Sequence, residues 1–324
     1  MIMADKERVK IVIPGDDPAQ CAGSQHLEKL KPYGDVKLYS DRPGSSAEKV
    51  ARAKEADILI NSRGVVSWGA EEFNQLPNLK MIATCSIGTD MFDLEAAKDK
   101  GIIICNQPGR TAPVVAEHMF GLMFAAAKRV AYFTAGVKEG KWLRMDNMMV
   151  QGKTLGIVGT GAIGAEMARL GRAIGMNVVA WTYNPTPKRA EKLGVTFVEL
   201  DELLQKADII SLHVKLTDDS NGLIGKRELG MMKPGAILLN GARGAVVDTG
   251  ALVDALNAGR LGGVGIDVYD QEPVPPDYPL LACEQVVLTP HCADMTPEGV
   301  DLLNSGAVEN IIAYLEGKTQ NRVT

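Results

Sequence analysis

Hydrophobic positions along the chain fall into short runs of β-branched and aliphatic residues, separated by stretches in which apolar residues recur at helical spacing. This alternation of strand-like and helix-like patterns is typical of a parallel sheet whose strands are joined by crossover helices. The first strand-like runs lie at residues 11–13, 36–39, 58–60, 81–84 and 102–104. We therefore predict an α/β domain over this part of the chain.

The same alternation restarts near Gly156. Its strand-like runs lie at residues 154–158, 177–180, 208–211, 236–239, 263–266 and 286–288. A long helical zone, about 114–140, separates the two sets, and a last helical pattern covers 297–316. No Ser/Gly-rich or Pro-rich linker lies between the two sets. The pattern predicts two Rossmann-like or flavodoxin-like domains with parallel sheets, the first of which is discontinuous and completed by the last helix.

A glycine-rich turn directly follows the run at 154–158 and reads Gly159-Thr160-Gly161-Ala162-Ile163-Gly164. The residues after it continue at helical spacing until Gly175. A lone GxGxxG is a weak signal, but a strand before it and a helix after it let backbone N–H groups approach a pyrophosphate. We therefore predict a dinucleotide-binding domain over 108–295 and a substrate domain over 1–107 and 296–324.

Composition narrows the possible partners. The chain has 324 residues, of which 46% are hydrophobic and 23% charged, and its net charge of -5 offers no basic surface for nucleic acid or anionic membrane. Residues 1–10 lack the apolar core of a signal peptide, and the most apolar helical stretch, 119–127, is too short to cross a bilayer. Five cysteines without CxxC spacing indicate reduced thiols and no metal site. These features favour a cytoplasmic protein.

Polar residues follow three neighbouring strand-like runs of the second domain. Arg243 follows 236–239, Asp267 and Glu272 follow 263–266, and His291 follows 286–288. The carboxyl ends of parallel strands meet at the crevice where a ligand lies, so we expect these four side chains to gather there.

This set of side chains has a consistent chemistry. Arg243 offers a planar fork of donors suited to a carboxylate. His291 titrates near neutrality, as an acid or base for an alcohol must. Glu272 would orient the imidazole and raise its pKa by stabilising the charged form.

The sequence resembles the D-isomer-specific 2-hydroxyacid dehydrogenase family over nearly its whole length. The resemblance lies in the glycine turn and in the segments NGARGAVVD, GIDVYDQEP and TPHCADMT, in the family's order and spacing. It implies an NAD(P)-dependent oxidoreductase that interconverts a 2-ketoacid and a D-2-hydroxyacid. It further implies that His291 is the proton donor and acceptor, Glu272 its partner and Arg243 the substrate clamp. Asp267 matches the residue that contacts the nicotinamide carboxamide.

The resemblance also implies the remaining site residues and a homodimer. The loop Ser86, Ile87 and Gly88 would bind the substrate carboxylate together with Arg243 and His291. The implied cofactor contacts are Gly159, Gly161, Ala162, Ile163, Gly164, Thr182, Tyr183, Asn184, His213, Val214, Gly241, Ala242, Arg243, Asp267, His291 and Ala293. His118 lies on a helix that resembles the family's dimer-forming region, and we expect it to serve packing or helix orientation.

Departures from the family pattern leave the cofactor open between NAD and NADP. Thr182 stands where NAD-dependent members have an acidic residue that binds the ribose hydroxyls. Lys188 and Arg189 follow and could attract a 2′-phosphate, or could simply begin a solvated helix.

Other departures bear on the substrate. Glu272 argues against a formate dehydrogenase and Ile87 against a phosphite dehydrogenase, while Asn61 replaces a phosphate-facing arginine. A small unphosphorylated acid such as glyoxylate or hydroxypyruvate is therefore expected. A phosphoglycerate or sugar-acid dehydrogenase is the alternative within this class of enzymes. An NAD(H)-sensing, corepressor-like binding protein is the alternative outside it.

Overall fold

The computed structural model describes residues 8–64 and 66–324, and the chain divides into two compact units. Unit 1 consists of Met1–Arg110 and Thr296–Thr324, and unit 2 of Thr111–Met295. The prediction about a signal peptide concerns residues that lie largely outside the described ranges. Within those ranges, no helix is long and apolar enough to cross a membrane, and no disulfide joins two cysteines.

Within the described residues, unit 1 is built on a five-stranded parallel sheet in the order β2-β1-β3-β4-β5. The strands are β1 (Val9–Ile13), β2 (Gly34–Leu38), β3 (Ile58–Asn61), β4 (Met81–Thr84) and β5 (Ile103–Cys105). The helical segments are η1 (Gln25–Leu30), α1 (Ser46–Ala53), α2 (Ala70–Phe73), α3 (Leu94–Asp99) and α11 (Pro297–Leu315). All five strands lie where the hydrophobic runs predict them.

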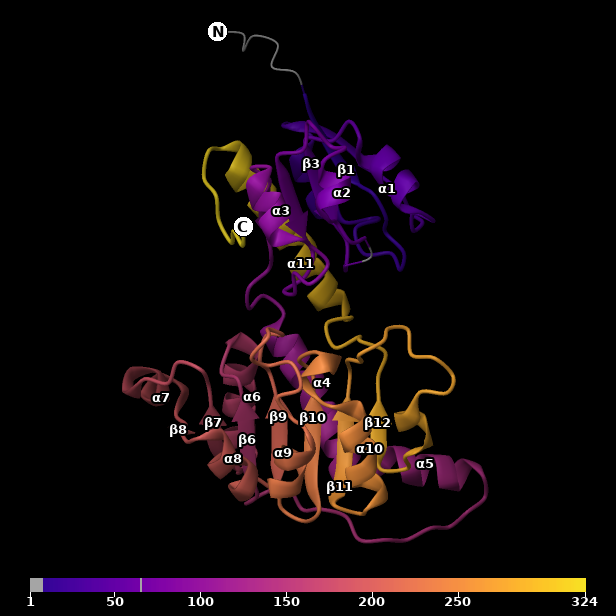
Figure 1. Cartoon of the computed structure of the whole chain (residues 1–324), viewed down its shortest axis with the longest axis vertical. Helices are drawn as coiled ribbons and strands as arrows, with labels where there is room; N and C mark the ends of the chain where they lie inside the picture. The colour runs from indigo at the N-terminus through magenta and orange to yellow at the C-terminus, as the bar shows by residue number, and fades with distance from the viewer. Residues whose placement is uncertain (1–7, 65) are drawn as a thin grey trace. The chain divides into compact units, whose positions relative to one another are not determined.

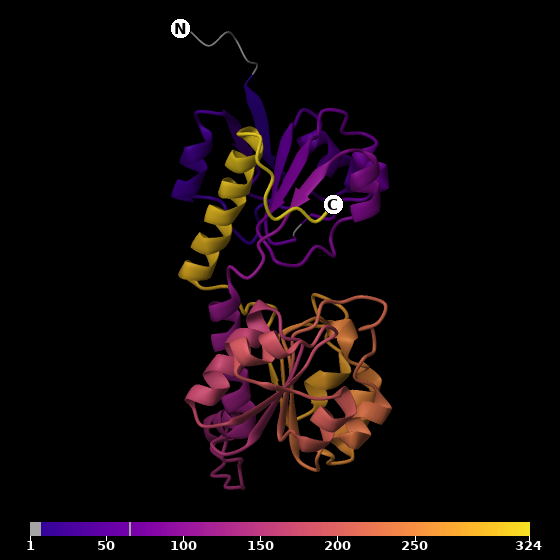
Figure 2. The same ribbon diagram turned by 90° about the vertical axis from the view of Figure 1, so that its left-hand side faces the viewer.

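Helix α11 completes unit 1, as Figure 2 shows in yellow. Its buried Leu303, Ala307 and Ile311 recur every four residues and share one core with Ile11 and Ile13 of β1. The intervening residue of that strand, Val12, faces the opposite core, because side chains alternate along a strand. The predicted fold class is therefore confirmed, including a first domain that is discontinuous in sequence.

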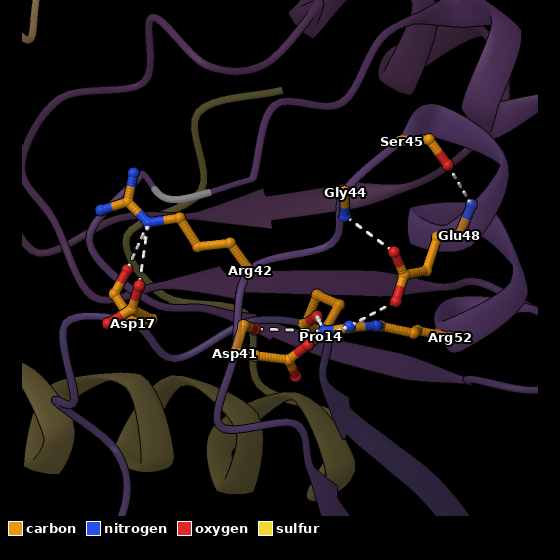
Figure 3. A network of polar contacts seen from close by, with 8 residues as sticks. All are labelled: Pro14, Asp17, Asp41, Arg42, Gly44, Ser45, Glu48 and Arg52. Carbon is orange, nitrogen blue, oxygen red and sulfur yellow. Dashed lines mark hydrogen bonds and ion pairs between the residues drawn. The ribbon is translucent and has the colours of Figure 1, made fainter.

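An arginine network fixes the loops that follow β1 and β2 (Figure 3). The Arg52 side chain is buried and donates to Glu48 at 2.6 Å, to the Asp41 carboxylate at 2.7 Å and to the Pro14 carbonyl at 3.0 Å. The hydrogen bond from Arg52 lowers the pKa of Asp41, and bonds from the Gly44 N–H and then Arg52 lower that of Glu48. Both carboxylates therefore stay charged around the buried guanidinium.

Unit 2 holds a seven-stranded parallel sheet over its described residues, in the order β12-β11-β10-β9-β6-β7-β8 (Figure 1). Its strands are β6 (Thr154–Val158), β7 (Asn177–Trp181), β8 (Thr196–Phe197), β9 (Ile209–Leu212), β10 (Ala236–Asn240), β11 (Leu261–Ile266) and β12 (Val286–Leu288). The strand order reverses at β6, which lies between β7 and β9. In a doubly wound sheet the ligand crevice lies at this reversal, beyond the carboxyl ends of the strands.

Helices flank this second sheet. They are α4 (Ala112–Ala127), α5 (Val130–Lys138), α6 (Ala162–Ala173), α7 (Pro187–Leu193), α8 (Leu200–Lys206), α9 (Lys226–Met231) and α10 (Thr249–Asn257), with short 3₁₀ turns η2 (Gly244–Val246) and η3 (Pro279–Ala282). The helical zone predicted at about 114–140 consists of two helices, α4 and α5. The break falls at Arg129, whose backbone is left-handed with φ 53°.

Candidate active site

The glycine turn is tightly packed on one side and open on the other. Gly159 has φ +95°, and a Cβ there would lie 2.8 Å from the backbone of His213. A Cβ at Gly164 would lie 2.0 Å from the Gly159 carbonyl oxygen. A Cβ at Gly161, the N-cap of α6, would meet nothing within 4 Å. The turn therefore leaves the N-terminal N–H groups of α6 accessible, as a pyrophosphate requires.

Two buried polar groups beside this turn lack a protein partner within the described residues. They are Oγ1 of Thr160 and Nδ1 of His213. Nε2 of His213 lies 2.8 Å from the Ser211 hydroxyl, and burial lowers the pKa of this histidine to about 3, so the ring is neutral. Buried polar atoms are normally satisfied, so these orphaned groups fit a polar ligand at the turn. The residues present therefore fit a bound dinucleotide.

The residues after β7 bear on the choice between the two cofactors. Thr182 is half-buried, and Tyr183 and Asn184 are exposed. Arg189, in the first turn of α7, donates to the Thr160 carbonyl at 2.6 Å and to the Asn184 carbonyl at 3.3 Å. Its guanidinium is thus held by hydrogen bonds to the glycine turn and to the segment after β7, rather than extending into solvent.

The loop after β10 is shaped by a residue that the sequence motif contains but whose role we did not predict. Asn240 accepts from the Ala242 N–H at 3.0 Å and donates to the Arg243 carbonyl at 2.9 Å, closing the turn that presents Arg243. The Arg243 guanidinium also donates to the Ala242 carbonyl at 2.7 Å. Gly241 lies against α4, where a Cβ would come within 2.4 Å of the Met119 sulfur.

Gly244 joins this loop to the one after β11. A Cβ on Gly244 would lie 1.9 Å from the carbonyl carbon of Tyr269, so Gly244→Ala must force two backbones apart. We expect this change to lower the free energy of unfolding by about 1–3 kcal/mol, a typical cost of overpacking, and to displace Arg243. Gly230→Ala is the matched control, because it lies in α9 with nothing within 4 Å and gains up to about 1 kcal/mol of helix propensity. Urea denaturation measures the free energy of unfolding of both variants. Equal stabilities would contradict the clash expected at Gly244.

Asp267 connects the end of β11 to the loop after β12 through hydrogen bonds. It is only 1% exposed and accepts from the N–H groups of Cys292 and Ala293, both at 3.0 Å, and from the Thr289 hydroxyl at 2.6 Å. Burial raises the pKa of Asp267, but hydrogen bonds from His118, Thr289 and the Cys292 N–H outweigh it and lower that pKa. Asp267 therefore remains a carboxylate that orients the segment preceding and following His291.

His118 of α4 contacts this carboxylate. Its Nε2 lies 2.9 Å from the Thr289 hydroxyl and 3.4 Å from Asp267. The sequence interpretation gave His118 a packing or orienting role, and the structure adds a polar contact with the site. The signal was a histidine on a helix face otherwise made of buried apolar residues such as Val115 and Met119.

His291 and Glu272 form a close pair. Nδ1 of His291 lies 2.7 Å from one Glu272 oxygen, and the other oxygen accepts from the Tyr269 N–H at 2.9 Å. The bond to Glu272 raises the pKa of His291 despite partial burial. Burial raises the pKa of Glu272, but the bonds from His291 and Tyr269 outweigh it and lower that pKa, so the pair favours imidazolium and carboxylate.

Two further features distinguish the position of His291. Its backbone is left-handed at φ 50°, which costs a non-glycine residue about 1–2 kcal/mol. The charge of Arg243 is close enough to oppose the rise in the pKa of His291 and to lower that of Glu272. The three predicted catalytic side chains therefore belong to one electrostatic cluster at the carboxyl ends of β10, β11 and β12.

The predicted substrate loop lies in unit 1, directly after β4. The Ser86 hydroxyl donates to the Gly88 carbonyl at 2.8 Å, and the Asn106 side chain donates to the Ile87 carbonyl at 2.7 Å. The carbonyls of Ile87 and Gly88 are thus held by donors of unit 1 itself. The substrate contacts assigned to this loop stay a prediction.

Comparison with known proteins gives a consistent picture. Residues 120–293 match the model of the D-isomer specific 2-hydroxyacid dehydrogenase NAD binding domain. A glyoxylate reductase of Korarchaeum cryptofilum is 38% identical over 90% of each chain. A D-3-phosphoglycerate dehydrogenase of Archaeoglobus fulgidus is 40% identical over 85% of this chain, which spans 53% of that longer protein. The crystal structure of a glyoxylate reductase from Paecilomyes thermophila superimposes with a TM-score of 0.89, at 28% identity over 98% of this chain and 99% of that one.

Proposed function

Because the chain belongs to the D-isomer specific 2-hydroxyacid dehydrogenase family and is an NAD(P)-dependent oxidoreductase, we propose that it reduces a small unphosphorylated 2-ketoacid. Glyoxylate and hydroxypyruvate are the substrates we favour, and the product is the D-2-hydroxyacid. The observation that carries the proposal is the hydrogen bond of 2.7 Å between His291 Nδ1 and Glu272, close enough to Arg243 for its charge to act on the pKa of His291. These groups supply a proton and an anion site, as reduction of a ketoacid requires.

In this mechanism, Arg243 binds the substrate carboxylate and the neighbouring carbonyl oxygen through its planar fork of donors. When bound, the nicotinamide cofactor supplies the hydride for C2. Because Glu272 holds Nδ1 of His291, Nε2 delivers the proton to the developing alkoxide. Arg243 stabilises the negative charge on that oxygen as it forms.

The preference for an unphosphorylated acid is supported by Asn61. This residue is fully buried and uncharged, and its Oδ1 accepts from the Trp68 indole at 3.0 Å. It provides no cation for a phosphate group. Because some relatives are named phosphoglycerate dehydrogenases, a phosphorylated acid is the alternative substrate.

The test is a panel of initial rates with NADH and NADPH against glyoxylate, hydroxypyruvate, pyruvate and phosphohydroxypyruvate. We expect the highest kcat/KM with glyoxylate or hydroxypyruvate. A clear preference for phosphohydroxypyruvate would replace the proposal with a phosphoglycerate dehydrogenase. Absent turnover with tight cofactor binding and NADH-dependent partner capture would replace it with the sensing role.

We base the expected cofactor preference on Arg189. The segment Thr182 to Asn184 contains no carboxylate to repel a 2′-phosphate, and Arg189 lies fastened beside it. We therefore expect NADPH to be preferred over NADH, and Arg189→Ala to raise the KM for NADPH about tenfold, the loss of one charged contact worth about 1.4 kcal/mol. The KM for NADH should change little. Lys188→Ala is the control, since Lys188 is exposed; an equal effect of both variants would contradict a specific role for Arg189.

The pH dependence follows from the Glu272 contact. Protonated His291 is the acid for reduction, so activity is present below its pKa and is lost as pH rises through it. Glu272 raises that pKa, so Glu272→Gln should move the loss of kcat/KM to lower pH. Profiles of kcat/KM against pH for the wild type and Glu272→Gln test this expectation. If both lost activity at the same alkaline pH, the pairing of His291 with Glu272 would be contradicted.

We also propose that the protein is a cytoplasmic homodimer. Apolar side chains are exposed along α5 and the irregular segment after it, and a second copy of the chain would bury them. These residues include Val130, Val137, Trp142, Met145 and Met149, and Trp142 is 79% exposed. Light scattering after gel filtration should give twice the monomer mass of 34.7 kDa. A monomer mass would contradict the proposal.

A further inference from the structure

Three different metal-ligating side chains converge in unit 2. A ring nitrogen of His118, a carboxylate oxygen of Asp267 and the sulfur of Cys292 all lie within 4.8 Å of one another. They come from α4, from the end of β11 and from the loop after β12. Asp267 is buried, while His118 and Cys292 are half-buried, so the group can be reached from the surface.

We propose that His118, Asp267 and Cys292 bind a divalent transition metal ion, with Zn²⁺ as the best fit, and that this ion inhibits the enzyme. Nitrogen, oxygen and sulfur are the donors that Zn²⁺ takes in proteins. With bonds of about 2.0–2.3 Å, tetrahedral ligand atoms lie about 3.5 Å apart. The 3.4 Å separation of His118 Nε2 and Asp267 Oδ1 already meets this distance, and rotation of the Cys292 side chain can bring in the sulfur.

The charges of the group also suit a divalent cation. Asp267 supplies a carboxylate oxygen, and the Cys292 thiol gives its proton to solvent when the metal–sulfur bond forms. Two negative ligands and a neutral imidazole then cancel the charge of the ion, which limits the cost of placing it beside a buried carboxylate. The ion must displace the bonds of the Thr289 hydroxyl to His118 and Asp267.

Inhibition follows from what Asp267 does in the apo protein. Its carboxylate holds the N–H groups of Cys292 and Ala293, the two residues directly after His291. A metal ion bound to Asp267 and Cys292 therefore reorganises the loop that presents the catalytic histidine. Cysteine spacing alone gave no sign of this site, because its three ligands come from distant segments and only one is a cysteine.

The binding test uses the full chain without cofactor and Co²⁺ as the probe. We expect one Co²⁺ per chain, a sulfur-to-cobalt charge-transfer band in the near ultraviolet, and loss of that band when Zn²⁺ is added. Cys292→Ser keeps the backbone N–H that bonds Asp267, and should abolish the band and weaken Zn²⁺ binding at least about tenfold by calorimetry. Cys283→Ser is the matched control, a half-buried thiol of the same unit, and should bind both ions like the wild type.

The site would be overturned if the wild type showed no charge-transfer band. It would also be overturned if the band survived in Cys292→Ser or disappeared in Cys283→Ser. If Cys292→Ser does not fold, as judged by circular dichroism, His118→Gln takes its place with the same expected loss of Zn²⁺ affinity. Zn²⁺ should also inhibit turnover of the wild type and of Cys283→Ser, reversibly with a chelator, and inhibit Cys292→Ser only at higher concentration. Inhibition of all three proteins alike would overturn the inhibitory role. Because the binding measurements need no turnover, they separate failure of this site from failure of the proposed substrate.

Discussion

His291→Ala is expected to reduce kcat for 2-ketoacid reduction by about a hundredfold or more, with a much smaller change in the Kd for the cofactor. Transfer of a proton by a positioned side chain contributes about 10²–10⁴ in rate, and the hydrogen bond to Glu272 raises the pKa of His291, which favours the protonated form that an acid needs. Single-turnover rates and fluorescence titration of NAD(P)H measure the two quantities. Turnover close to that of the wild type would sink the assignment of His291 as the acid.

His291→Asn provides the sharper version of this experiment. The left-handed backbone at φ 50° is unfavourable for alanine, so His291→Ala combines loss of the imidazole with a backbone change. Asparagine tolerates this conformation and can still donate to Glu272, but it cannot exchange a proton near neutral pH. We therefore expect His291→Asn to fold like the wild type and to be as inactive as His291→Ala. An active His291→Asn would mean that the histidine orients the loop without taking part in proton transfer.

The sequence was sufficient for the strands other than β8 and for the three charged side chains, because both depend on local patterns. Alternating buried runs predict parallel strands, and parallel strands bring the residues after them to the same edge of the sheet. Arg243, Glu272 and His291 each follow such a run directly. Their gathering in one electrostatic cluster therefore needed no knowledge of helix packing.

Other features depend on contacts that no local pattern encodes. His118 contacts Asp267 only because α4 packs in one particular register on β11 and β12, which depends on many side chains at once. The break between α4 and α5 falls at Arg129, where neither glycine nor proline marks it. Strand β8 is only two residues long, too short for a period of two to be recognised. The first two features depend on long-range contacts, and β8 is too short to show a sequence pattern, so local propensity could predict none of the three.

Arg243→Ala is expected to lower kcat/KM by about 10²–10³, the usual cost of removing a donor that stabilises a developing oxyanion. Arg243→Lys should recover only part of this loss, because an ammonium keeps the charge but not the planar fork. The loss should fall on both kcat and KM, since Arg243 binds the carboxylate in the ground state and the alkoxide in the transition state. An effect on KM alone would contradict the second role.

The pH profile of the same variant gives an independent check of the cluster. Arg243 opposes the rise in the pKa of His291, whereas Glu272 causes it. Removing the arginine should therefore move the alkaline loss of activity to higher pH, and Glu272→Gln should move it to lower pH. A purely structural role for Arg243 would lower the rate without moving this limb. Opposite displacements in the two variants would thus establish that both charges act on the same imidazole, which is the physical requirement of the proposed mechanism.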